Sequence, residues 1–171
     1  MLIEQGFVAD DVLESRRVLG DLGAGGRSGR PGRIRGLCRD ESGAVELVAP
    51  LKAGAARMRD FDALVIPGGR APDRMRLRHA MVDLVSEAMV AGKPLAAIGH
   101  GPQLLITASV LRGRTLTCWP SIAVDVKNAG GLYVDRPVVR DANLITSRKA
   151  ADLPMLLEAL VTALSEPPAP A

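Results

Sequence analysis

The chain has 171 residues, of which 47% are hydrophobic and 24% are charged, and its formal net charge is +3. This composition is ordinary for a globular protein, and no apolar run reaches the roughly 18 residues that a membrane-spanning helix needs. At this length we expect a single domain, residues 1–171. There is no charged-then-apolar leader of the secretory type, so we expect the protein in the cytoplasm. The two cysteines, Cys38 and Cys118, are too few for a disulfide framework and lack metal-ligand spacing, so we expect neither a metal nor another cofactor.

The N-terminal third begins with the end of an apolar strand, Met1–Ile3, which starts abruptly. Apolar residues then recur at helical spacing after Asp10, a residue type that favours helix N-termini, and Gly23 ends the pattern. We therefore predict a helix from Asp10 to Leu22. Further along, the alternating stretch from Ala44 to Leu51 indicates a short strand.

Between these elements, residues 24–43 are rich in arginine and glycine and follow no strong period, which predicts an irregular loop or sheet edge. The arginines are Arg27, Arg30, Arg33, Arg35 and Arg39. Cations beside Cys38 would lower the pKa of its thiol. A basic run of this kind can contact nucleic acid, but the chain holds only four Phe, Tyr or Trp residues to stack on bases. We interpret the segment as a solvated loop and do not expect nucleic acid as a partner.

From residue 60 onward, strands and helices alternate. The apolar run Ala63–Ile66 ends at Pro-Gly-Gly and predicts a strand buried on both faces of a parallel sheet. A helical pattern follows over 72–91, then a second buried strand over 94–98 and a helix over 102–111. The remaining predicted elements are strands at 115–119, 133–135, 137–140 and 144–146, helices at 122–129 and 151–164, and a frayed tail at 167–171.

This alternation predicts an α/β fold with a mainly parallel sheet sandwiched between helices. Functional groups in such folds gather at the carboxyl ends of the strands. The segments Pro67–Arg70 and Gly99–His100 occupy two such ends. We therefore expect them to face each other across one crevice.

The segment Ala96–Gln103 has the pattern of a nucleophile turn that lacks its nucleophile. A buried strand that breaks sharply into a helix holds the residue at the break in a strained position. The start of the helix offers unpaired N–H groups to an anion. Chemistry built on this geometry uses Cys or Ser at the break with a base alongside. Here the residue at the break is Gly99, followed by His100.

In these motifs the chain resembles the ThiJ/PfpI superfamily, and within it the intracellular protease I-like branch related to protein deglycases. The matching stretches are 62–72, 96–103, 147–149 and 152–154, and the resemblance is dense from about residue 60 to 164. The family usually has Ala-Ile-Cys-His-Gly-Pro-Gln where this chain has Ala97-Ile98-Gly99-His100-Gly101-Pro102-Gln103. The resemblance implies a flavodoxin-like, class I glutamine amidotransferase-like fold and a hydrolase of the protease, deglycase or glyoxalase type, linked to stress response. It also implies a homodimer or higher homo-oligomer with the site near the interface.

The resemblance further implies which positions form the site. The family's Cys nucleophile falls on Gly99, and its adjacent His falls on His100. An N-terminal Glu that hydrogen-bonds the thiol falls on Asp11, and a second Glu, offered to the neighbouring subunit's site, falls on Asp73. Both acids are one methylene shorter in this chain. The main-chain oxyanion pocket would be formed around Gly69, Arg70, His100 and Gly101.

The same residues also have ordinary structural interpretations. Gly99 suits strained dihedral angles, Asp11 and Asp73 suit the first turns of helices, and Cys118 suits a buried apolar position. His79 fits an exposed helix position. Two functions therefore stay open: a catalytically impaired homologue that still binds a small carbonyl or carboxylate compound, and an active hydrolase in which His100 and Asp11 activate water.

Overall fold

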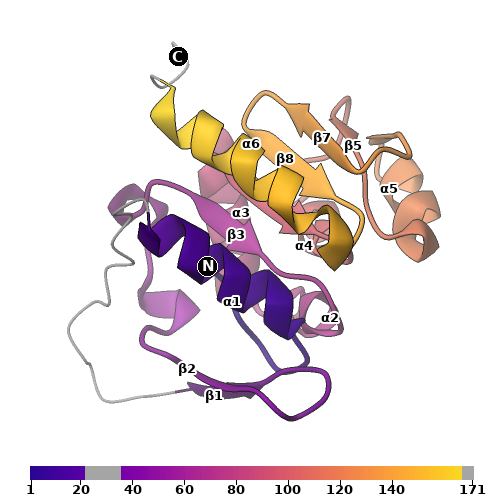
Figure 1. The fold of residues 1–171 in the computed structure, drawn as a ribbon. Helices are drawn as coiled ribbons and strands as arrows, with labels where there is room; N and C mark the ends of the chain where they lie inside the picture. The colour runs from indigo at the N-terminus through magenta and orange to yellow at the C-terminus, as the bar shows by residue number, and fades with distance from the viewer. Residues whose placement is uncertain (22–35, 167–171) are drawn as a thin grey trace.

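The computed structural model describes residues 1–21 and 36–166. Its centre is a sheet of four strands. The strands are β3 (Leu64–Ile66), β4 (Leu95–Ile98), β8 (Leu144–Ser147) and β7 (Val138–Asp141), in that spatial order, and Figure 1 labels β3, β8 and β7. β3, β4 and β8 run parallel, and β7 is antiparallel to β8. Every residue of the three parallel strands is buried, as the apolar runs of β3 and β4 predict. The predicted α/β fold is confirmed.

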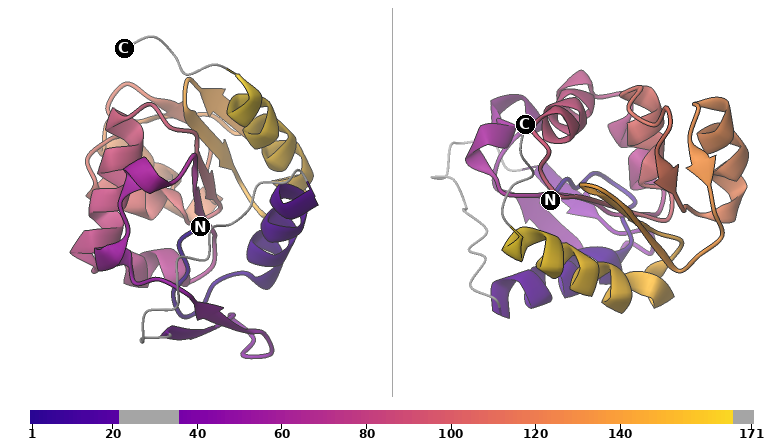
Figure 2. Two further views of the ribbon diagram at one scale, coloured as in Figure 1. Left: turned by 90° about the vertical axis from the view of Figure 1, so that its left-hand side faces the viewer. Right: turned by 90° about the horizontal axis from the view of Figure 1, so that it is seen from above.

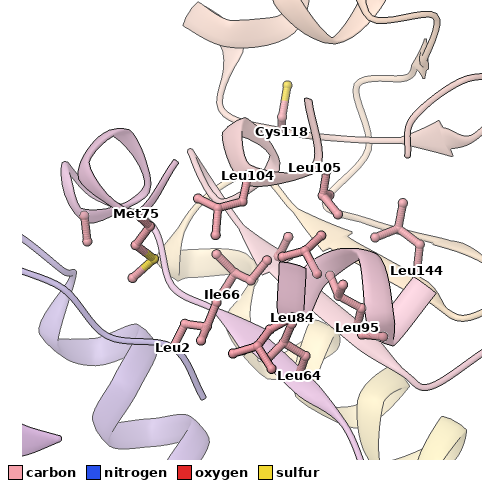
Figure 3. Packing of buried hydrophobic residues seen from close by; sticks show 14 of the residues in the cluster. Leu2, Leu64, Ile66, Met75, Leu84, Leu95, Leu104, Leu105, Cys118 and Leu144 are labelled. Carbon is pink, nitrogen blue, oxygen red and sulfur yellow. The ribbon is translucent and has the colours of Figure 1, made fainter. Parts of the chain in front are cut away.

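Helices cover both faces of this sheet (Figure 2). On one face, α1 (Ala9–Asp21) and α6 (Leu153–Ser165) pack together over Val65, Ile98 and Ile145. On the other face lie α2 (Ala71–Met75), α3 (His79–Val90) and α4 (Pro102–Thr107). Their apolar side chains meet the sheet in the larger core cluster, where residues from the strands and from these helices interdigitate (Figure 3). Among the described residues, no helix combines the length and apolar character needed to cross a bilayer.

The prediction of one continuous helix over 72–91 is wrong, because the chain forms two helices, α2 and α3, with a break between them. Met75 is fully buried, whereas Leu77 is 78% exposed. Arg78 is extended (φ −103°, ψ 98°), and its carbonyl accepts the first N–H groups of α3, from Met81 and Val82. The sequence pattern does not indicate this break, because the apolar residues on both sides of it keep helical spacing.

Two other helices begin or end elsewhere than predicted. α4 ends at Thr107, and Ser109 adopts a left-handed conformation (φ 57°) that stops the helical run well before residue 111. α6 begins at Leu153, after a 3-10 turn over Ala150–Asp152. Other short elements include α5 (Ala123–Asn128) and the parallel pair β5 (Thr115–Leu116) and β6 (Leu132–Tyr133).

The N-terminal third contains a β-hairpin that the sequence predicts only in part. β1 (Gly36–Arg39) pairs antiparallel with β2 (Glu46–Ala49), so the strand predicted within 44–51 is confirmed. The irregular loop or sheet edge predicted over 24–43 contains a regular strand, β1, which the sequence did not indicate. Residues 22–35, with the first four of the five arginines, lie outside the described residues. The apolar run at the N-terminus forms no assigned strand, although the Leu2 N–H donates to the Val65 carbonyl at 3.0 Å.

Candidate functional site

The turn after β4 places Gly99 in a conformation that suits a residue without a side chain. Its φ is +56°, in the left-handed region that costs other residues about 1–2 kcal/mol. Its N–H donates to the Ser147 carbonyl and its carbonyl accepts from the Trp119 N–H, both at 2.9 Å. A Cβ at this position would lie 3.4 Å from the Arg148 carbonyl oxygen and 3.9 Å from the Gly68 Cα. These are ordinary contacts, so the backbone leaves room for a side chain that the sequence does not supply.

Gly101 has a different reason to be glycine. A Cβ there would lie 2.9 Å from the Ile98 nitrogen and 3.0 Å from the Ile66 carbonyl oxygen, which the packed backbone does not permit. Its N–H donates to the Ile98 carbonyl at 2.7 Å and is therefore not available to a ligand in this conformation. The His100 N–H, by contrast, has no acceptor among the described residues.

Asp11, in the first turn of α1, is the buried acid of this region. It is 1% exposed, and its Oδ2 accepts the Gly68 N–H at 2.8 Å. Its Oδ1 has no hydrogen-bond partner within the described part of the chain. Burial raises the pKa of Asp11 to about 6, with the Gly68 N–H opposing and the charges of Asp10 and Glu41 adding to the rise. Because Gly68 also borders the space at Gly99, the buried carboxyl and the turn belong to one site.

The ring of His100 points toward the segment after β5 rather than toward Asp11. Its Nε2 lies 3.2 Å from the Ser121 Oγ, and its ring stacks on Trp119 with centroids 5.9 Å apart. Burial lowers the pKa of His100, and the charge of Glu41 partly opposes that effect. This shift favours the neutral imidazole, and no hydrogen bond joins the ring to Asp11 in the residues that the structure describes.

The segment Gly69–Arg70 meets a residue that sequence reasoning missed. Glu41, at the tip of the β1–β2 hairpin, accepts the Arg70 N–H through its Oε1 at 3.0 Å. Its Oε1 also lies 3.5 Å from the Arg70 Nε. Nothing in the sequence singled out this acid inside an arginine-rich stretch, because its contact with Arg70 spans 29 positions and exists only in the folded hairpin.

The other predicted site residues are placed as follows. Asp73 lies exposed in the first turn of α2 and makes no recorded contact with Asp11 or Gly99. His79 is exposed, as expected. Cys118 is fully buried, and burial raises the pKa of its thiol to about 12. The lowered pKa expected for Cys38 is wrong: Cys38 is buried in β1, and burial together with the charge of Glu4 raises its thiol pKa.

Two surface hollows of about 380 and 390 Å³ lie away from Gly99, one beside Glu4 and Arg78 and the other between α1 and the start of α6. Among the described residues, no group of three or more His, Cys, Asp or Glu side chains is arranged to hold a metal ion.

A parallel-sheet fold with a strained strand-to-helix turn beside a buried carboxyl is typical of enzymes that place a nucleophile at that turn. The chain belongs to the DJ-1/PfpI family, whose model matches residues 33–163. It is 53% identical over 94 residues to a deglycase of Pyrococcus horikoshii, and the matched region covers 55% of this chain and 57% of that protein. It is 42% identical over 117 residues to general stress protein 18 of Bacillus subtilis, which covers 68% of each. The chain thus spans little more than half the length of the deglycase.

Solved structures agree with this assignment. A two-domain protein of Anabaena variabilis, containing DJ-1/ThiJ/PfpI-like and ferritin-like domains, matches with a TM-score of 0.86 and 36% identity, over 95% of this chain and 46% of that one. DJ-1beta of Drosophila melanogaster matches with a TM-score of 0.81 over 96% of this chain and 88% of that one. At 23% identity, the second likeness shows the fold alone.

Proposed function

We propose that this chain is a DJ-1/PfpI family member that binds a small carbonyl or carboxylate compound at Gly99 without performing cysteine chemistry. The observation that carries the proposal is the turn itself, which has φ +56°, room for a side chain, and none present. A covalent thioester needs a thiol at this position. The two cysteines among the described residues, Cys38 and Cys118, are buried and lie in other strands or segments.

Several features support ligand binding. The His100 N–H has no acceptor in the described residues, and the unpartnered Asp11 Oδ1 is buried nearby. A buried polar atom without a partner costs free energy that a ligand or a water can recover. One relative is named a deglycase, and a small carbonyl ligand agrees with that name.

The alternative function is hydrolysis by water that His100 and Asp11 activate. General base catalysis requires the base within hydrogen-bond reach of the water and a partner that orients it. The His100 ring instead engages Ser121 and Trp119, and Asp11 engages Gly68. We therefore favour the binding function.

We also propose that a second copy of the chain completes the site. Asp73 is exposed on α2 and makes no recorded contact with the turn of its own chain, which fits a residue that acts across an interface.

The test compares the wild type, Gly99→Cys and His100→Ala with methylglyoxal as the probe. The wild type should convert methylglyoxal no faster than buffer, and His100→Ala should not change that result. Gly99→Cys should gain a measurable rate. Turnover by the wild type that His100→Ala abolishes would overturn the proposal in favour of the water-activating hydrolase.

A further inference from the structure

The Glu41 carboxylate places a negative charge beside the main chain of Gly69–Arg70, which borders the proposed site. We propose that Glu41 is a specificity-determining residue, which makes the site at Gly99 accept uncharged carbonyl compounds and reject carboxylates. The inference rests on the proposed binding function and narrows its ligand class. It starts from one contact, the bond between the Glu41 carboxylate and the Arg70 N–H.

The backbone of residues 6–7 anchors the hairpin tip that carries Glu41. The Glu41 N–H donates to the Phe7 carbonyl at 3.0 Å, and the Gly6 N–H donates to the Arg39 carbonyl at 2.8 Å. Phe7 is fully buried and forms bridges to both Asp40 and Gly69. The hairpin tip is therefore held beside the turn after β3, which keeps the Glu41 carboxylate within reach of the Arg70 N–H.

The carboxylate fills the place where an incoming anion would bind Gly69–Arg70. Its Oε1 accepts the Arg70 N–H, and the Arg70 guanidinium is also engaged, donating from its Nη2 to the Glu41 carbonyl at 3.3 Å. A Cβ at Gly69 would lie 3.1 Å from the Glu41 Cδ, so the carboxylate lies directly over this glycine. A ligand carboxylate would have to displace Glu41 before it could bind these donors.

The charge of Glu41 also reaches the two side chains that flank Gly99. It raises the pKa of both Asp11 and His100, although each of these groups responds more strongly to its own burial. With a pKa of about 6, Asp11 is mostly ionised at pH 7.5 and adds a second negative charge. A ligand carboxylate therefore meets the negative charges of Glu41 and Asp11, and the Arg70 guanidinium is already paired with Glu41. An uncharged carbonyl oxygen meets the His100 N–H without that repulsion.

The test uses pyruvamide and pyruvate, two α-carbonyl compounds of similar shape that differ in charge. Binding is followed at pH 7.5 by the fluorescence of Trp119, the single tryptophan of the chain, and by the amide NMR signals of residues 99–101. The wild type should bind pyruvate at least about tenfold more weakly than pyruvamide. Glu41→Gln keeps an acceptor for the Arg70 N–H and removes the charge, so the two affinities should converge to within about threefold.

The matched control is Glu46→Gln, which removes a negative charge from the same hairpin, where Glu46 pairs with Arg39. The control should keep the wild-type preference, and Glu41→Gln should also lower the His100 pKa in an NMR titration. An unchanged preference in Glu41→Gln would overturn the role of Glu41 while leaving the binding function in place. If neither compound bound the wild type or Glu41→Gln, and both were folded, the binding function and this inference would fail together.

Discussion

Replacing Asp11 by Asn should stabilise the protein, and more so as the pH rises. The pKa of Asp11 is raised from 3.8 to about 6, chiefly by burial, so the folded state holds the proton more tightly than the unfolded state does. The ionised carboxylate therefore destabilises the fold progressively as the pH rises from about 4 through 6. Since a tenfold change in proton affinity is worth about 1.4 kcal/mol, the full cost above pH 7 is about 3 kcal/mol.

Asp11→Asn removes this cost and keeps an acceptor for the Gly68 N–H. The free energy of unfolding is measured in urea at pH 8 and at pH 4 for the variant and the wild type. The difference between the two proteins should favour the variant by about 2 kcal/mol more at pH 8 than at pH 4. Any fixed cost of burying the amide group is the same at both pH values and cancels in this comparison. Asp83→Asn, exposed on α3 and not among the charges that shift the Asp11 pKa, serves as the control and should stay within about 0.5 kcal/mol of the wild type at both pH values. A pH-independent difference for Asp11→Asn would refute the argument that the charged carboxyl is buried beside Gly99.

Two further substitutions, with Arg140→Ala as a control for the second, test the surroundings of the turn by urea unfolding. Gly99→Ala should cost about 1 kcal/mol, because strain at φ +56° is partly offset by a less flexible unfolded chain; a loss above about 3 kcal/mol would show that the space for a side chain is absent. Arg148→Ala should cost about 2–3 kcal/mol, because it leaves the buried carboxylate of Asp152 without its partner at 3.0 Å. Arg140→Ala, which breaks an exposed pair with Glu166, should cost less than about 1 kcal/mol. Equal losses in the two arginine variants would contradict this interpretation.

The sequence predicts the sheet and the turn well because both depend on local patterns. β3 and β4 are continuous apolar runs that end at glycines, and such runs between helical patterns become buried parallel strands. The contact between the two turns follows, because the carboxyl ends of adjacent parallel strands meet at one edge of the sheet. Gly68 and Gly99 indeed lie side by side there.

The errors come from interactions that join distant parts of the chain. The arginines near Cys38 suggest a lowered thiol pKa, but pairing with β2 buries the thiol near Glu4 instead. The same hairpin brings Glu41 to Arg70, which no local pattern signals. A composition rich in arginine and glycine thus hid both a strand and the acid that borders the site.

The central claim is that the turn at residue 99 still provides a nucleophile position and lacks only the nucleophile. The most direct test is the rate at which iodoacetamide alkylates each thiol of Gly99→Cys at pH 7.5, measured by peptide mapping. Cys38 and Cys118 are buried with raised thiol pKa values and should react slowly in both proteins. We predict that the introduced thiol reacts at least about tenfold faster than either of them, and that unfolding in urea removes the difference. A thiol at position 99 that reacts no faster than Cys118 in the folded protein would contradict the claim.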